Sequence, residues 1–144
     1  MTKQMLVVGV TGWHNSGKTT YIETLVKALV ARGIHVGVIK HTRQEVALDT
    51  EGTDSWRMGQ AGAERVALVG PAGMACYEYG PEPSLREVLS RFCFDLDLVL
   101  VEGYKSEPLL WIEVRRTMAD EPVHVKGERL ALVCGEPLQA DVPI

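Results

Sequence analysis

The stretch that decides the fold covers residues 5–20 and reads MLVVGVTGWHNSGKTT. Its first six residues are a nearly unbroken apolar run, which is typical of a parallel strand covered on both faces. After a glycine-rich turn, apolar residues recur at helical spacing from Ile22 to Val30, and Gly33 predicts the end of that helix. A second apolar run at residues 34–39 completes a strand–helix–strand unit, whose crossover should be right-handed.

The turn in this unit carries a complete phosphate-binding pattern. Residues 12–19, GWHNSGKT, match GxxxxGK[ST] at every fixed position. Gly12 and Gly17 let the backbone curl so that successive N–H groups face one concavity. Lys18 places a cation against the β- and γ-oxygens, and the Thr19 hydroxyl is suited to ligating Mg²⁺. The stretch therefore predicts a site for a purine triphosphate with Mg²⁺, at the positive end of a helix dipole.

The rest of the chain predicts a small α/β domain without internal linkers or repeats. Residues 41–53 show neither period, and so long a loop in a small domain is typically functional or mobile. The other expected elements are a helix over 54–61, a hairpin or two adjacent strands over 64–69 and 74–79, and a helix after Ser84 with the stripe Leu85, Val88, Leu89 and Phe92. Further strands are expected at 98–101, 109–114 and 130–134. We expect one P-loop NTPase-like domain over residues 1–144, with a mostly parallel sheet, helices on both faces and an additional antiparallel hairpin.

A carboxylate that completes the site is expected at the end of a neighbouring strand. Residues 97–103, DLVLVEG, place Glu102 after four apolar residues and before a glycine. Glu102 is predicted to reach the Mg²⁺ shell or to orient water, and the open alternative is an ordinary acid at a strand end. Asp97 begins the strand, at the opposite edge of the sheet, and is predicted to be structural.

Polar residues that follow the second strand form a third candidate group. Lys40 and His41 lie at the edge where open α/β sheets bind ligands. Carboxylates of the next loop can approach the γ-phosphate and metal, as switch loops do. Asp54 fits this catalytic role, and N-capping of the short helix explains it equally well. Asp49 is a weaker candidate, because a loop acid is more often simply solvated.

Composition excludes several classes of partner. The net charge is −4 and no basic cluster occurs, so neither nucleic acid nor an anionic membrane is expected as a partner. Cys76, Cys93 and Cys134 are widely spaced, which predicts buried or half-buried thiols in a reducing compartment. No signal peptide and no run near ~20 apolar residues occurs, so a cytoplasmic protein is expected. No guanine-reading Asn-Lys-x-Asp motif and no arginine finger is apparent, so unaided hydrolysis should be slow.

Together these stretches resemble the molybdopterin-guanine dinucleotide biosynthesis adapter protein family. The matching pieces are collinear over about 95 residues: 12–20, 38–41 (VIKH), 49–57 (DTEGTDSWR), 61–63 (AGA) and 97–105 (DLVLVEGYK). The resemblance implies a homodimeric GTP-binding protein with at most weak GTPase activity. It would assist the guanylyltransferase that joins GMP to molybdopterin.

The resemblance also implies roles for individual residues. The family's nucleotide site maps onto Gly12, Trp13, His14, Asn15, Ser16, Gly17, Lys18, Thr19 and Thr20, with Thr19 and Glu102 near Mg²⁺. A switch or pterin-facing edge would comprise Lys40, His41, Asp49, Asp54, Arg57 and Lys105. Contacts to the base are expected from the late loop at 135–137.

Two other functions use the same phosphate loop. A small-molecule kinase normally needs a lid with arginines, and the adjacent pair Arg115 and Arg116 is interpreted as the end of a strand. A metallochaperone GTPase of the nickel-insertion type would need a Cys/His cluster, and the three cysteines offer no such spacing. Both stay open as alternatives to the adapter.

Overall fold

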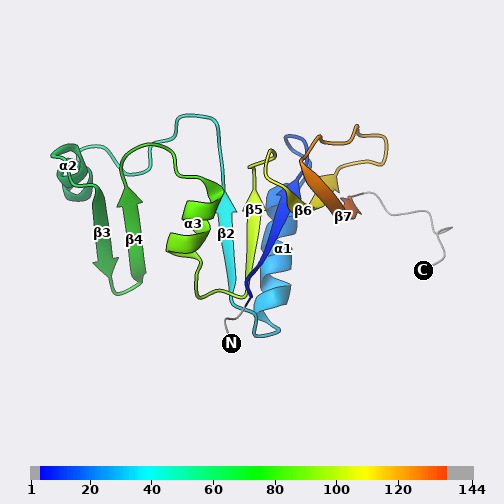
Figure 1. Cartoon of the computed structure of the whole chain (residues 1–144), viewed down its shortest axis with the longest axis horizontal. Coiled ribbons are helices and arrows are strands. Elements are labelled where there is room, and N and C mark those ends of the chain that lie inside the picture. The colour runs from blue at the N-terminus through cyan, green and yellow to red at the C-terminus, as the bar shows by residue number, and fades with distance from the viewer. Residues whose placement is uncertain (1–3, 136–144) are drawn as a thin grey trace. The chain divides into compact units, whose positions relative to one another are not determined.

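A computed structural model describes residues 4–135. Its elements are β1 (Leu6–Thr11), α1 (Lys18–Val30), β2 (Val36–Lys40), α2 (Asp54–Gln60), β3 (Arg65–Gly70), β4 (Gly73–Glu78), α3 (Leu85–Phe92), β5 (Leu98–Glu102), β6 (Leu109–Arg115) and β7 (Gly127–Cys134) (Figure 1). Within this part of the chain, no helix is long and apolar enough to cross a membrane. The residues form two compact units, one comprising residues up to Thr42 and from Leu85 onward, the other Arg43–Ser84. The expectation of a single domain stays a prediction.

The first unit is built on a five-stranded sheet of order β2-β5-β1-β6-β7 in which every pairing is parallel. β1 lies between β5 and β6, so the strand before the phosphate motif is the centre of the sheet. In register, Glu102 lies opposite both Val10 of β1 and Lys40 of β2. Since the strands are parallel, all their carboxyl ends meet at one edge. The predicted mostly parallel α/β sheet is confirmed.

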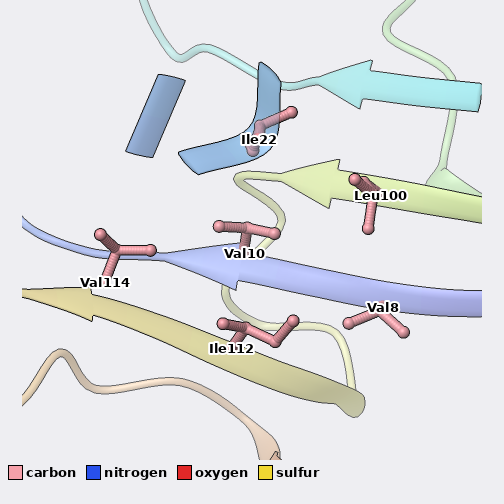
Figure 2. Close-up of a cluster of buried hydrophobic side chains, with 6 residues drawn as sticks. All are labelled: Val8, Val10, Ile22, Leu100, Ile112 and Val114. Atoms are coloured by element: carbon pink, nitrogen blue, oxygen red, sulfur yellow. The ribbon is translucent and has the colours of Figure 1, made fainter. Parts of the chain in front are cut away.

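One face of this sheet is covered by α1. Ile22 of α1 joins a cluster of buried aliphatic side chains, drawn in Figure 2: Val8, Val10, Leu100, Ile112 and Val114. These residues come from β1, β5 and β6, so the helix that follows the phosphate motif packs onto β1 and onto both strands that pair with β1. Burying each such side chain contributes about 1.5–3 kcal/mol, which holds α1 against the sheet.

The opposite face is covered by α3, which completes three layers. Leu85 and Cys93 pack there with Val99 and Val101 of β5. The expected stripe on α3 is wrong at its last member, because Phe92 is 66% exposed whereas Cys93 is fully buried. α3 ends at Phe92, and the turn that follows, closed by a bond from the Leu96 N–H to the Cys93 carbonyl, directs the thiol inward.

The cysteines differ from one another in exposure. Burial, with the nearby charge of Asp95, raises the pKa of the Cys93 thiol. Cys134 is half-buried, whereas Cys76 is exposed. The expectation of three buried or half-buried thiols is therefore wrong for Cys76. This residue lies on β4, and a strand of a two-stranded sheet buries less of its surface than a strand in a larger sheet.

The second unit contains α2 and the antiparallel hairpin β3–β4, as predicted. Gly59 of α2 lies against Tyr79, since a Cβ there would come within 2.3 Å of the Tyr79 ring. Thr53, with an extended backbone, is the N-cap of α2, and its Oγ1 accepts a bond from the Trp56 N–H. N-capping is therefore the wrong explanation of Asp54, which lies one residue inside the helix. At this position its negative charge interacts favourably with the positive end of the helix dipole.

The contact between β1 and β6 gives a direct test of the sheet. A Cβ at Gly9 would lie 2.3 Å from Cε3 of the fully buried Trp111, whose Nε1 donates to the Lys126 carbonyl at 2.6 Å. We expect Gly9→Ala to lower the free energy of unfolding by about 1–3 kcal/mol, measured by urea denaturation. Gly135→Ala is the control, because its Cβ would meet nothing closer than 3.4 Å. Equal stability of the two variants would contradict the packing described.

Candidate functional site

A cavity of about 490 Å³ lies where the carboxyl ends of the central strands meet. It is lined by residues 14–20, which cover the phosphate motif from its third residue and the start of α1, together with Lys40, Glu102 and Arg116. Lys40 and Glu102 end neighbouring strands, in register with each other. The sheet thus brings two of the predicted site residues to the phosphate motif, although they lie more than sixty residues apart in sequence.

The backbone of the motif suits an anion. Gly17 is the N-cap of α1, with φ 95° and no side-chain cap, so the helix N-terminus opens onto the cavity. The first N–H groups of a helix have no intrahelical partner, and they carry the positive end of its dipole. A Cβ at Gly12 would lie 2.4 Å from the Val114 carbonyl, so the loop requires glycine there to pack against β6. Asn15 holds a left-handed conformation, with φ 58°.

Lys18 folds back across the motif. Its Nζ donates to the carbonyls of Gly12 at 2.9 Å and Trp13 at 2.8 Å. An ammonium group has three donors, so one remains for an anion in the cavity. The phosphate loop thus holds the Lys18 side chain in place by itself, without a ligand.

The charges around Lys18 favour a negative ligand. Burial is the main cause that lowers the pKa of Lys18 from its ordinary value of 10.5. Glu102 opposes this shift, while the charges of Lys105 and Lys40 lower the pKa further. Lys105 is not among the lining residues, but its charge is close enough to lower the pKa of Lys18. A phosphate beside these cations would relieve their mutual repulsion.

The residues present also fit a magnesium ion carried by a phosphate ligand. Among residues 4–135 no group of three or more His, Cys, Asp or Glu side chains is arranged to hold a metal. Mg²⁺ usually keeps several waters and takes one or two protein ligands plus substrate phosphates. Thr19 and Glu102 both line the cavity and supply a hydroxyl and a carboxylate. In addition, Ser16 Oγ is buried and has no hydrogen-bond partner within the described chain. An oxygen atom of a bound phosphate would supply such a partner.

His41 supports the site from outside the cavity. Its N–H donates to the Glu102 carbonyl at 2.7 Å, and its ring stacks on Tyr104 with centroids 4.1 Å apart. Gly103, at φ 96°, permits this turn, because a Cβ there would lie 2.7 Å from the His41 carbonyl. The sequence Glu102-Gly103-Tyr104 therefore forms a tight turn that holds the carboxylate strand against β2.

The remaining predicted residues are not among the lining residues of this cavity. Asp49, Asp54 and Arg57 belong to the second unit, where Asp49 Oδ1 accepts a bond from the Thr50 N–H and its charge acts on Tyr79. Their switch or catalytic roles stay predictions. Asp97 accepts a bond from the His35 N–H at 2.8 Å, at the opposite edge of the sheet, which is a structural contact. Of the late loop expected to contact the base, residues 136 and 137 lie outside the described chain.

The segment 116–126, which follows β6, is a part of the site that sequence reasoning missed. Arg115 does end β6 as interpreted, but its neighbour Arg116 lines the cavity and donates through Nη2 to the Asn15 carbonyl. Trp13 Nε1 donates to the Glu121 carbonyl at 2.7 Å, so two contacts join this segment to the phosphate motif. No motif marks either contact, because the partners lie about one hundred residues apart.

Glu113, within β6, anchors this segment and was also missed. Its carboxylate is fully buried and accepts bonds from Arg115 Nε at 2.8 Å and the Val123 N–H at 3.1 Å. Arg129 Nη2 lies 2.8 Å from Oε2, close enough for an ion pair although not aligned as a hydrogen bond. Burial alone would raise the pKa of Glu113. The hydrogen bonds and the two arginine charges outweigh it, so its pKa lies below the usual value.

This lowered pKa predicts a pH-dependent stability. A carboxylate with a depressed folded pKa stabilises the fold above its unfolded pKa of about 4.3, and that contribution is lost as the pH falls through the folded pKa. We expect Glu113→Gln to lower the free energy of unfolding by about 3–5 kcal/mol at pH 7, and the difference from wild type to narrow in acid. Urea denaturation at several pH values measures both.

The control for this experiment is Glu87→Gln. Glu87 pairs with Arg91 on the exposed surface of α3, so the substitution should change stability little at any pH. A constant difference between Glu113→Gln and wild type down to acid pH would contradict the charge network.

Comparison with known proteins assigns the chain to a family. The family model described as molybdopterin guanine dinucleotide synthesis protein B matches residues 7–135. A molybdopterin-guanine dinucleotide biosynthesis adapter protein of Haemophilus influenzae is 41% identical, over 98% of this chain and 81% of its own. The adapter protein of that name from Escherichia coli is 34% identical, over 92% and 79%. The crystal structure of Bacillus subtilis MobB aligns with a TM-score of 0.75 at 25% identity, covering 97% of this chain and 88% of that one. The chain therefore belongs to the molybdopterin guanine dinucleotide synthesis protein B family.

Proposed function

We propose that the chain is a GTP-binding adapter in the synthesis of molybdopterin guanine dinucleotide. The observation that carries the proposal is the cavity in which the phosphate motif meets Lys40 and Glu102. The pathway follows from the names of relatives at 41% and 34% identity, both called adapter proteins of this biosynthesis. In this proposal the partners are GTP, the guanylyltransferase and its pterin substrate, and a second copy of the chain.

Each residue of the cavity has a role in holding the triphosphate. The N-terminus of α1 and Lys18 bind the phosphate oxygens, and Lys40 adds a second cation. Thr19 would supply a hydroxyl to Mg²⁺, and Glu102 would accept from a water on the metal. The bound Mg²⁺ would neutralise charge on the β- and γ-oxygens. Glu102 is the one carboxylate among the described lining residues, so it is also the candidate to orient an attacking water.

An adapter needs binding and release more than fast turnover. A carboxylate that orients water, without further groups to stabilise the leaving phosphate, supports slow hydrolysis at most. Asp54 is the second candidate for this role, and its place in the second unit makes that role depend on how the loop 43–53 approaches the nucleotide. The kinase alternative has no comparable support, since the arginine in the cavity comes from the end of β6 and not from a lid.

Isothermal titration of GTP and of ATP, each with Mg²⁺, tests the function directly. We expect GTP to bind and ATP to bind more weakly. Lys18→Ala should weaken triphosphate binding by roughly 100-fold, because a charge-assisted bond in a partly buried site is lost. Lys27→Ala, a lysine exposed on the same helix, is the control and should bind like wild type. Failure of the wild type to bind GTP would overturn the function, and full affinity of Lys18→Ala would overturn the site.

The metal role of Glu102 has its own test. Glu102→Gln keeps the size of the side chain but removes its charge, so the gain in GTP affinity on adding Mg²⁺ should fall several-fold, while affinity in the presence of a chelator changes little. The measurement is the GTP dissociation constant over a magnesium titration. Glu23→Gln, which alters an exposed acid on α1, should keep the wild-type response. An unchanged magnesium response in Glu102→Gln would remove Glu102 from the site.

A further inference from the structure

The cavity contains an arginine that lies outside the phosphate motif. We propose that Arg116, which directly follows β6, is a phosphate-binding residue of the nucleotide site, and this inference rests on the proposed function. Its guanidinium donates to the carbonyl of Asn15, the fourth residue of the motif, and its side chain lines the same cavity as Lys18 and Thr19.

Strand pairing explains why Arg116 reaches the motif. β6 runs parallel to β1 with Thr11 opposite Glu113, so the residues after Glu113 run beside those after Thr11. Arg116 is therefore level with the phosphate loop, and the two are delivered to the same edge by the same sheet.

The backbone of Arg116 is held on both sides. Asp120 accepts bonds from the N–H groups of Arg116 at 2.9 Å and Thr117 at 3.1 Å, which closes a tight turn directly after β6. Further along, the Val123 N–H is bound by the buried Glu113. With its backbone fixed, the arginine needs to order only its side chain on binding a ligand, which lowers the entropic cost.

The chemistry of the side chain fits an anion rather than a structural clasp alone. A guanidinium has five N–H donors in a planar fork, and the Asn15 carbonyl is a neutral partner that takes up only part of them. The acid near Arg116 is Asp120, whose pKa is lowered by backbone hydrogen bonds and in part by the arginine charge, and whose carboxylate binds the backbone N–H of Arg116. The side chain is exposed on the cavity side, where Lys18 and Lys40 already gather positive charge in a protein whose net charge is −4. Such a fork binds phosphate oxygens through two parallel bonds.

Three substitutions separate phosphate binding from support of the loop. Arg116→Ala removes charge and donors, Arg116→Lys keeps the charge, and Arg116→Gln keeps a donor for Asn15 without charge. We expect GTP and GDP, titrated with Mg²⁺, to bind Arg116→Ala and Arg116→Gln about tenfold or more weakly, and Arg116→Lys within a few-fold of wild type. The salt dependence of the dissociation constant should flatten in the two uncharged variants alone.

The control is Arg86→Ala, which removes the same charge from the exposed surface of α3 and should bind like wild type. Circular dichroism and urea denaturation check that each variant is folded. Wild-type affinity in Arg116→Ala would overturn the inference. So would full affinity and salt dependence in Arg116→Gln, since the residue would then only support Asn15. If the wild-type chain binds no nucleotide, the proposed function itself fails. If the wild type binds nucleotide and the Arg116 variants bind equally well, only the role of Arg116 fails.

Discussion

The parallel pairing of β1 with β5 on one side and β6 on the other is the constraint on which the structure depends. It brings three chain reversals to one edge: the phosphate motif after β1, the Glu102 turn after β5 and the Arg116 turn after β6. Parallel strands need covering on both faces, and α1 and α3 provide that cover. The site is thus a consequence of strand order, and its residues come from segments that are far apart in the sequence.

Packing around β1 leaves little freedom in how this edge is formed. Gly9 is pressed against the Trp111 ring, and Gly12 against the Val114 carbonyl, so β1 and the start of the loop are fitted to β6 at two successive points. At the far side, Gly103 lies against His41. These close approaches, together with the hydrogen bonds from Trp13 and Arg116, determine where the loop lies relative to its neighbours.

Charge is distributed in two different ways at this edge. The cations of the cavity are Lys18, Lys40 and Arg116, and Glu102 is the one acid among the described lining residues, an arrangement that favours an anion. Asp120, next to Arg116, lies outside this lining. Glu113 is the opposite case, a buried acid matched by two arginines and a backbone N–H, which stabilises a loop and offers nothing to a ligand. A protein of net charge −4 thus concentrates positive charge locally at this edge.

The sequence by itself determined the elements whose signals are local. The phosphate motif, the strand and helix on either side of it, the hairpin and the family were all readable, because apolar periodicity and glycine spacing act within a few residues. What only the tertiary structure decided depends on contacts between distant segments. Arg116 carries no local signal, since strand pairing brings its partner Asn15 beside it. Glu113 has a local partner in Arg115, but its burial and its pairing with Arg129 follow from the sheet. Phe92 is exposed because its helix ends there, and Thr53 rather than Asp54 caps its helix because its backbone is extended. These partners, exposures and caps follow from how distant segments pack, and residue type and spacing within one segment do not predict that packing.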